Sequence, residues 1–301
     1  MLEDLKLAPA YEGLLFLAEA MRNPPVLRPH QHAELELNLV TAGEITYVVE
    51  GARYRFPRRS LLWLFPAQQH QLVDRTSDAA YYVAAFKPDL IKRACRGPFY
   101  RDLKRQRPSE EGVIHRCLAP DECEDLAHEM RAIVEDGLDA DLLNREAGFG
   151  ISKAFSFRHN DPDWLNAGLR HILLYGWRLQ QRPGRRSQAV KLNPAVRKAL
   201  DRLEADPTDV TLAMLARHCG CSESFLSRTF RQEVGANFAH YRNSVRLGRF
   251  WEYYRSGQCE TLLEAVFAAG FGSYAQFSRV FTAAYGTSPR RALATGSPRQ
   301  S

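Results

Sequence analysis

Short β-prone runs dominate residues 26–90 of this 301-residue chain. The runs LELNLV, ITYVVE, ARYRF, LLWLF and AAYYVAAF are rich in branched and aromatic side chains. They are separated by Gly43, Gly51, Pro57, Pro66 and Pro88. Short strands at regular spacing, bounded by Gly and Pro, are typical of a β-sandwich or a β-barrel. The pattern therefore predicts an all-β unit in the first part of the chain.

Two later segments, residues 121–145 and 163–181, show helical periodicity. The second carries an apolar stripe from Trp164 to Trp177, which fits either a core-facing side or a dimer face. Residues 181–191 (QRPGRRSQAVK) are polar, basic and interrupted by Pro and Gly, as is typical of a linker. After this linker the pattern is helical to about residue 291.

The last third of the chain contains an internal repeat. Its first copy is TLAMLARHCGCSESFLSRTFRQEVG (Thr211–Gly235), and its second is TLLEAVFAAGFGSYAQFSRVFTAAYG (Thr261–Gly286). In each copy a glycine, Gly220 or Gly270, suits the left-handed turn that ends a first helix. Ser222 or Ser273 then suits the N-cap of a second helix. The repeat predicts two helix-turn-helix units, although an all-α bundle with two similar hairpins has the same pattern.

The second helix of each unit is predicted to bury one side and expose the other. Leu226 and Phe230, or Phe277 and Phe281, form the buried side. The exposed side carries Ser224, Ser227, Arg228 and Arg231 in the first copy, and Tyr274, Ser278 and Arg279 in the second. Small polar groups and arginines on an exposed helix suit base edges and phosphates in the major groove of DNA.

The charge distribution strengthens this hypothesis. Residues 1–189 contain 26 basic and 26 acidic side chains, whereas residues 190–301 contain 15 basic and nine acidic ones, which accounts for the whole net charge of +6. A basic region beside a neutral one indicates a polyanionic partner, or else a solvated basic face. Residues 238–255 are predicted to form one connecting helix of roughly 25 Å. This length allows the two units to enter successive major grooves about 34 Å apart.

The C-terminal repeat resembles the AraC/XylS family of bacterial transcription regulators. The resemblance covers about residues 190–296 and rests on the SxxxLSRxF pattern at Ser222–Phe230, on FSRVF at Phe277–Phe281 and on YGTSPRR at Tyr285–Arg291. It implies contacts with DNA from Ser224, Ser227 and Arg228 in the first unit and from Tyr274, Ala275, Ser278 and Arg279 in the second. It also implies a small-molecule sensor in front and dimerisation through helices behind the barrel.

These observations predict an α+β chain in four parts. The parts are a cupin-like sensor β-barrel at residues 1–95, a helical dimerisation segment at 96–181, a linker at 182–191 and an all-α DNA-binding domain at 192–296, with helix-turn-helix motifs at about 211–235 and 261–286. The expected partners are double-stranded DNA, a small-molecule effector and a second copy of the chain, with RNA polymerase as a further candidate. We expect no catalytic residues.

Histidines in the first part suggest a site within the barrel. In an extended PHQHAELELN run, His30, His32 and Glu36 share one face, and His70 follows a later strand. The HxHxxxE spacing, with Gly43 seven residues on, resembles the first motif of a cupin barrel. Three interpretations stay open: an effector pocket, a site for a divalent metal such as Zn, Fe, Mn or Ni, or structural histidines at a barrel rim. No other cofactor is expected.

Further side chains surround this predicted site. Aromatic residues on neighbouring strands suit either a pocket wall or the core, namely Tyr47, Trp63, Phe65 and Tyr81. Four arginines are expected on a solvated face, with an acidic ligand as the alternative, namely Arg53, Arg55, Arg58 and Arg59. Two rival functions also stay open: a metal-dependent cupin enzyme (oxygenase or isomerase) with a DNA-binding tail, and an architectural DNA-binding protein without a ligand.

Other chemistry is not indicated by the sequence. The nucleotide-binding patterns GxxxxGK[ST] and GxGxxG and the GxSxG nucleophile elbow do not occur. The six cysteines show no CxxC pairing and are interpreted as reduced thiols. No apolar run approaches about 18 residues, and the N-terminus lacks a basic leader. We therefore expect a cytoplasmic protein with no membrane partner.

Overall fold

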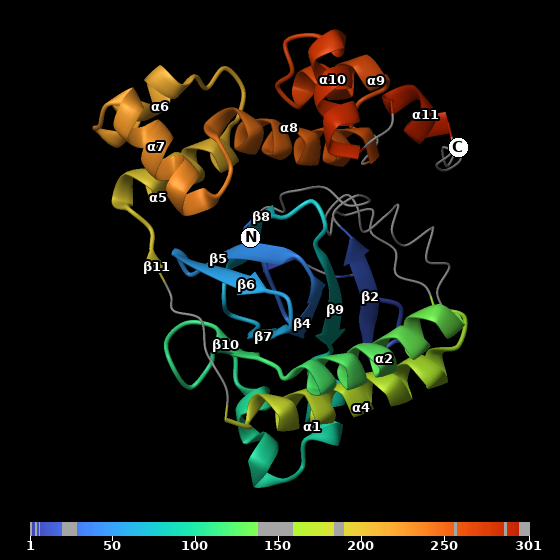
Figure 1. Cartoon of the computed structure of the whole chain (residues 1–301). Coiled ribbons are helices and arrows are strands. Elements are labelled where there is room, and N and C mark those ends of the chain that lie inside the picture. The colour runs from blue at the N-terminus through green and yellow to red at the C-terminus, as the bar shows by residue number, and fades with distance from the viewer. Residues whose placement is uncertain are drawn as a thin grey trace.

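The computed structural model combines a β-rich N-terminal part with an all-helical C-terminal part (Figure 1), which confirms the predicted α+β class. It describes residues 2–3, 5, 7–19, 29–137, 159–183, 190–255, 258–285 and 288–294. None of the helices within these ranges is long and apolar enough to cross a bilayer.

Two antiparallel sheets form the N-terminal part. The first contains, in spatial order, β10 (Ile114–Cys117), β7 (Ser60–Leu64), β4 (Leu35–Ala42), β9 (Ala80–Phe86) and β2 (Gly13–Glu19). The second contains β11 (Val190–Lys191), β6 (Ala52–Pro57), β5 (Glu44–Val49) and β8 (His70–Arg75). A short parallel pair joins β1 (Leu2–Glu3) to β3 (Gln31–His32). The two large sheets share one apolar core, and the Phe56 ring of β6 lies edge-on to His115 of β10, with their centroids 5.3 Å apart.

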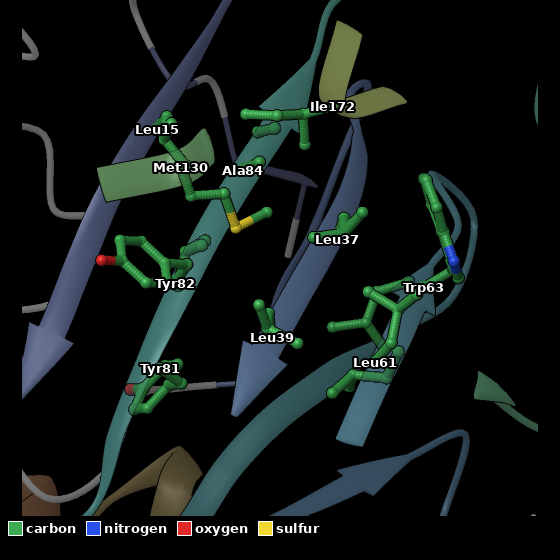
Figure 2. Close-up of a cluster of buried hydrophobic side chains, with 14 of the residues drawn as sticks. Leu15, Leu37, Leu39, Leu61, Trp63, Tyr81, Tyr82, Ala84, Met130 and Ile172 are labelled. Carbon is green, nitrogen blue, oxygen red and sulfur yellow. The ribbon is translucent and has the colours of Figure 1, made fainter. Parts of the chain in front are cut away.

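Strand β4 is buried on both of its faces, and its alternating side chains separate two environments. Leu37 and Leu39 contribute to an apolar cluster that also contains Met130 and Ile172 (Figure 2). Met130 belongs to α2 (Pro120–Gly137) and Ile172 to α4 (Pro162–Gln180), the two long helices that cover the outer face of the five-stranded sheet (Figure 1). The intervening side chains, including Glu36, therefore point between the sheets.

The apolar stripe of α4 belongs to this core. Between Trp164 and Trp177 the stripe residues Leu165, Leu169, Ile172 and Leu173 are fully buried, whereas Trp164 itself is 44% exposed. The Trp177 indole packs edge-on against Trp63 of β7 at 5.5 Å and donates a hydrogen bond to the Phe99 carbonyl at 3.1 Å. The core-facing interpretation of the stripe is confirmed, and the indole of Trp164 lies outside the buried stripe.

Several elements differ from those predicted. Segment 96–181, for which only helices were predicted, also supplies strand β10, which extends the five-stranded sheet. Strands β2 and β8 were missed as well. The sequence of β2, GLLFLAE, hardly alternates because both of its faces are covered, and β8 begins with two polar residues that are buried by tertiary contacts. Helix α1 (Pro88–Ala94) and the 3-10 helix η1 (Pro98–Lys104) follow β9.

Parts of the predicted segments lie outside the described residues. This holds for 138–145 of the helix predicted at 121–145, for 184–189 of the linker, for Gly286 of the second repeat and for 295–296 at the end of the DNA-binding domain. The last two residues of the predicted linker form a strand, because Val190 and Lys191 pair with Arg53 and Ala52 of β6.

The C-terminal part consists of helices around two separate cores. Its elements are α5 (Pro194–Ala205), α6 (Leu212–Cys219), α7 (Glu223–Val234), α8 (Phe238–Arg255), α9 (Leu262–Ala268), α10 (Tyr274–Tyr285) and α11 (Pro289–Ala294). Helix α8 has the predicted bounds and contributes Tyr241 and Val245 to the first core and Phe250 and Trp251 to the second. One continuous helix therefore holds the two repeat units apart.

We expect Trp177→Ala to lower the free energy of unfolding by about 3–5 kcal/mol, because it leaves a cavity between α4 and the sheet. Trp164→Ala in the same helix is the matched control and should cost less than about 1 kcal/mol in a monomeric sample, since surface substitutions have small effects. Urea unfolding of the two variants measures the difference. Equal losses would show that the indole of Trp177 does not anchor α4 to the sheet.

Candidate functional site

The first repeat unit is a helix-turn-helix whose turn is built from local signals. Thr211 caps α6 by accepting a hydrogen bond from the Met214 amide at 3.2 Å. Gly220 ends the helix at φ +69°, a left-handed conformation that costs glycine little. Ser222 then accepts from the Phe225 amide at 3.2 Å and starts α7. The predicted roles of Gly220 and Ser222 are confirmed.

The second unit repeats this construction with one addition. Gly270 has φ +91°, and a Cβ atom there would lie 2.6 Å from the side chain of Thr208, so glycine is required on two grounds. Ser273 accepts from the Gln276 amide at 3.1 Å and starts α10. At the N-terminus of α9, Thr261 and Glu264 form a reciprocal capping box. The TxxE spacing in the sequence could have predicted it.

Helices α7 and α10 each bury one side and expose the other. Leu226, Phe230, Phe277 and Phe281 are fully buried. Of the eight residues predicted to contact DNA, Ser224, Ser227, Arg228, Arg231, Tyr274, Ala275 and Arg279 are exposed and Ser278 is half-buried. Within the described residues, neither Arg228 nor Arg279 is held in an ion pair. The two units lie at opposite ends of α8, on the side of the molecule away from α2 and α4 (Figure 1).

A buried histidine cluster lies between the two sheets. His30 and His70 exchange backbone hydrogen bonds at 2.9 and 3.0 Å, which brings together residues forty positions apart. The ring centroids of His30 and His70 are 4.3 Å apart, and those of His32 and His70 are 5.3 Å apart. Glu36 lies beside them, and all four side chains are almost completely buried. The four residues proposed from the sequence thus meet at one place.

Hydrogen bonds orient two of the imidazole rings toward Glu36. The Nδ1 atom of His32 lies 3.0 Å from the Glu34 carbonyl oxygen, and Nδ1 of His70 lies 3.0 Å from the Gln68 carbonyl oxygen. The opposite ring atoms face the carboxylate, because Nε2 of His32 lies 3.0 Å and Nε2 of His70 3.8 Å from Glu36 Oε2. Asn38 donates to the other carboxylate oxygen, Oε1, at 2.6 Å.

These contacts shift the pKa values in opposite directions. Burial opposes the charged form of His32, but the hydrogen bond to Glu36 and the charges of Glu36 and Glu34 outweigh it and raise its pKa. Burial also opposes ionisation of Glu36, yet the bond from His32 and the two nearby imidazoles hold its pKa well below the ordinary range. For His70, burial dominates and lowers the pKa. The carboxylate of Glu36 thus favours the charged form of His32, whereas burial favours the neutral form of His70.

The surrounding aromatic residues divide between two environments. The Tyr47 ring lies 6.3 Å from His70, and burial, with the charge of Glu36, raises the pKa of its hydroxyl. Tyr81 is also buried, and burial raises the pKa of its hydroxyl, while the charge of Arg75 and a hydrogen bond with it oppose this rise. Trp63 instead packs on the helix side of the sheet, against Trp177.

The outer face of the four-stranded sheet docks against the first helix-turn-helix unit, an arrangement that sequence reasoning missed. Gln71 of β8 donates to the Tyr241 hydroxyl of α8 at 2.6 Å, and that hydroxyl donates to Glu204 of α5 at 2.9 Å. Val73 of β8 belongs to the apolar core formed by α5, α6, α7 and α8. In the sequence, the signal for this docking was Val73, an apolar residue on the face of β8 that points away from the barrel interior.

An arginine completes this interface. Arg53 of β6 donates from Nη1 to the carbonyl oxygens of Gln232 and Glu233 at 2.6 and 2.8 Å, at the C-terminal end of α7. A positive charge at this end of a helix is favourable, because the unpaired carbonyl oxygens carry partial negative charge. Arg53, which was expected on a solvated face with an acidic ligand as the alternative, is half-buried and bonds to backbone carbonyl oxygens. Its partner is a helix end far along the chain.

Two family models match separate parts of the chain. The family model described as an AraC-like ligand binding domain matches residues 13–150, and the model of a helix-turn-helix domain matches residues 215–295. A search of the curated proteins gives no significant match.

Among solved structures, the C-terminal domain of AraT, a response regulator from Geobacillus stearothermophilus, is 27% identical and covers 37% of this chain and 93% of its own length, with a TM-score of 0.34. ToxT from Vibrio cholerae is 12% identical and covers 94% of this chain and 98% of its own length, with a TM-score of 0.33. The AraC-like transcriptional activator CuxR is 13% identical over 88% of this chain and 83% of its own length, with a TM-score of 0.33.

The docked interface generates a double-mutant prediction. Gln71→Ala and Tyr241→Phe remove the two sides of one hydrogen bond, so their effects on the unfolding of the full chain should be coupled by about 1 kcal/mol. Ser244→Ala is the matched control on α8, since its hydroxyl bonds within the helix to the His240 carbonyl. Its effect should add to that of Gln71→Ala. Strict additivity of Gln71→Ala and Tyr241→Phe would contradict this contact.

Proposed function

Because the chain belongs to the AraC/XylS family of transcription regulators, we propose that it binds a specific double-stranded DNA sequence through α7 and α10, under the control of a small molecule held in its barrel. The observation that carries the proposal is the pair of helix-turn-helix units whose second helices expose arginines and small polar groups. The matched families are those of a transcription regulator and not of an enzyme. In this proposal residues 192–296 bind DNA, and the part before the linker senses the effector.

The chemistry of the two exposed faces supports DNA as the partner. Arg228 and Arg279 occupy equivalent places in the two repeats, and each guanidinium can donate two hydrogen bonds to guanine or contact a phosphate. Ser224 and Ser227 in α7, and Tyr274 and Ser278 in α10, supply short polar groups beside them. Arg231 on α7 adds a phosphate contact, whereas Ala275 offers only a methyl group. The surplus positive charge of the C-terminal third favours the duplex over other partners.

The histidine cluster is the proposed effector site. Four ionisable or polar side chains buried in an apolar barrel are costly unless they are paired or serve a ligand. Strand β8 offers a route from this site to the DNA-binding part, because His70 faces the cluster while Gln71 and Val73 contact the helices. A ligand controls DNA binding by this route only if it binds the two docking states with different affinity.

Three further parts of the proposal concern assembly and location. The protein pairs as a homodimer through the outward sides of α2 and α4, near the exposed indole of Trp164. RNA polymerase is a second protein partner at the promoter, and the cytoplasm is the compartment in which both meet DNA.

Analytical ultracentrifugation of the wild type and of Trp164→Glu tests the dimer, because a charge at the interface should dissociate it.

Selection of genomic fragments bound by the full chain identifies the operator, and variants then test the contacts. We expect Arg228→Ala and Arg279→Ala each to weaken operator binding by about 1–3 kcal/mol, or roughly 5- to 150-fold. If the arginine contacts a phosphate, its variant should reduce the salt slope by about one. Electrophoretic mobility shift at fixed salt measures the affinities.

Arg101→Ala is the matched control, since it makes the same change of charge at an exposed position of η1, outside the proposed dimer face on α2 and α4 and outside α7 and α10. It should leave the affinity within a factor of about two. Unchanged affinity of both Arg228→Ala and Arg279→Ala would refute the roles given to these residues. The absence of any salt-sensitive binding to duplex DNA would refute the proposed function itself.

A further inference from the structure

The histidine cluster has the donor set of a transition-metal site. One ring nitrogen from each of His30, His32 and His70 lies within 4.8 Å of the other two, and all three residues are buried. We propose that these three imidazoles and the carboxylate of Glu36 bind a divalent first-row metal ion. This inference rests on the proposed function in one respect, because it names the ligand of the site assigned above to the effector.

The orientation of the rings supports a metal ligand. The Nδ1 atoms of His32 and His70 can bond to the Glu34 and Gln68 carbonyl oxygens only by donating a proton. Each Nε2 is therefore the atom turned toward Glu36. Metal-binding histidines almost always use their second ring nitrogen in this way, because a bond to a carbonyl or carboxylate fixes the tautomer and the angle of the ring.

The atoms that face one another are separated by nearly the distances a metal requires. Ligand nitrogens lie about 2.1 Å from Zn²⁺, so two ligand atoms of a tetrahedral site are about 3.4 Å apart. The Nε2 atoms of His32 and His70 lie 3.0 and 3.8 Å from Glu36 Oε2, which brackets this value. The ligand nitrogens of His30, His32 and His70 all lie within 4.8 Å of one another.

A buried atom without a partner gives independent support. Within the described part of the chain, the Nε2 atom of His70 is inaccessible to solvent and forms no hydrogen bond. Such an orphaned acceptor is costly, and a native protein that retains one needs a reason. The same atom lies 3.8 Å from Glu36 Oε2. A bound cation supplies the missing partner.

The charges in the cluster favour a cation over an organic acid. Glu36 contributes a buried negative charge, and Asn38 directs its amide toward Glu36 and not toward the histidines. A carboxylate or phosphate ligand would be repelled by Glu36 at close range. Three imidazoles with one carboxylate suit Zn, Fe, Mn or Ni, because these ions accept mixed nitrogen and oxygen ligands.

Metal titration of the full chain tests the proposal directly. The purified protein is stripped with a chelator, dialysed and titrated with Zn²⁺ by calorimetry and with Co²⁺ by visible absorption. We expect one ion per chain and the d–d absorption bands of a four-coordinate Co²⁺ complex. His70→Gln and His30→Gln should each weaken Zn²⁺ affinity more than about 100-fold, because losing an outer-shell partner alone typically costs 10- to 100-fold.

His171→Gln is the matched control, since this histidine is exposed on α4. It should retain wild-type affinity and the wild-type Co²⁺ spectrum. If the histidine variants fail to fold, Glu36→Gln tests the site instead. Glutamine keeps a hydrogen-bonding group beside Asn38, but the loss of the carboxylate ligand should change the Co²⁺ absorption bands. Failure of the wild type to bind either ion at one per chain, or an equal loss in His171→Gln, would overturn the metal site.

The DNA affinity of the stripped protein is measured separately, so the two proposals can fail independently. A chain that binds its operator but no metal refutes the metal site and leaves the regulator intact, with an organic effector as the remaining occupant. A chain that binds metal at the predicted residues but no duplex DNA keeps the metal site and refutes the proposed function.

Discussion

The two faces of strand β8 link the two halves of this protein. Successive side chains of a strand point in opposite directions, so His70 and Gln71 cannot face the same environment. His70 joins the buried cluster between the sheets, while Gln71 bonds to Tyr241 of α8 and Val73 enters the core of the first helix-turn-helix unit. Any displacement of β8 at the histidine cluster therefore changes contacts with the DNA-binding part. The barrel and the helices are mechanically connected by one short strand.

Helix α8 sets a second constraint, because it contributes to both helical cores. Tyr241 anchors its first half beneath α7, and Phe250 anchors its second half beneath α10. The separation of the two exposed helices is therefore fixed by a helix rather than by a flexible linker. Among the described residues, the barrel contacts the first unit through Arg53 at the end of α7 and through Gln71 at α8. A displacement of these barrel residues would therefore act directly on the first unit.

The C-terminal part was predictable because its signals are local. Gly220 and Ser222 each act within one or two turns of their own position, so the turn geometry follows from neighbouring residues alone. Because the sequence is repeated, the same glycine and serine positions predicted the turn of the second unit independently. The strands that were missed lack such signals. Strand β2 is covered on both faces and shows no alternation, and the polar start of β8 resembles a loop until its partners are known.

The sequence by itself determined the two helix-turn-helix units, the length of α8 and the candidate set of His30, His32, Glu36 and His70, because periodicity, capping and spacing are properties of short stretches of chain. Only the tertiary structure decided that His30 pairs with His70, that both imidazoles of His32 and His70 face one carboxylate, and that Arg53 binds the end of α7. The contacts of His30 with His70 and of Arg53 with α7 join residues about forty and 180 positions apart. Their geometry depends on how whole sheets and helices pack, which no local pattern encodes.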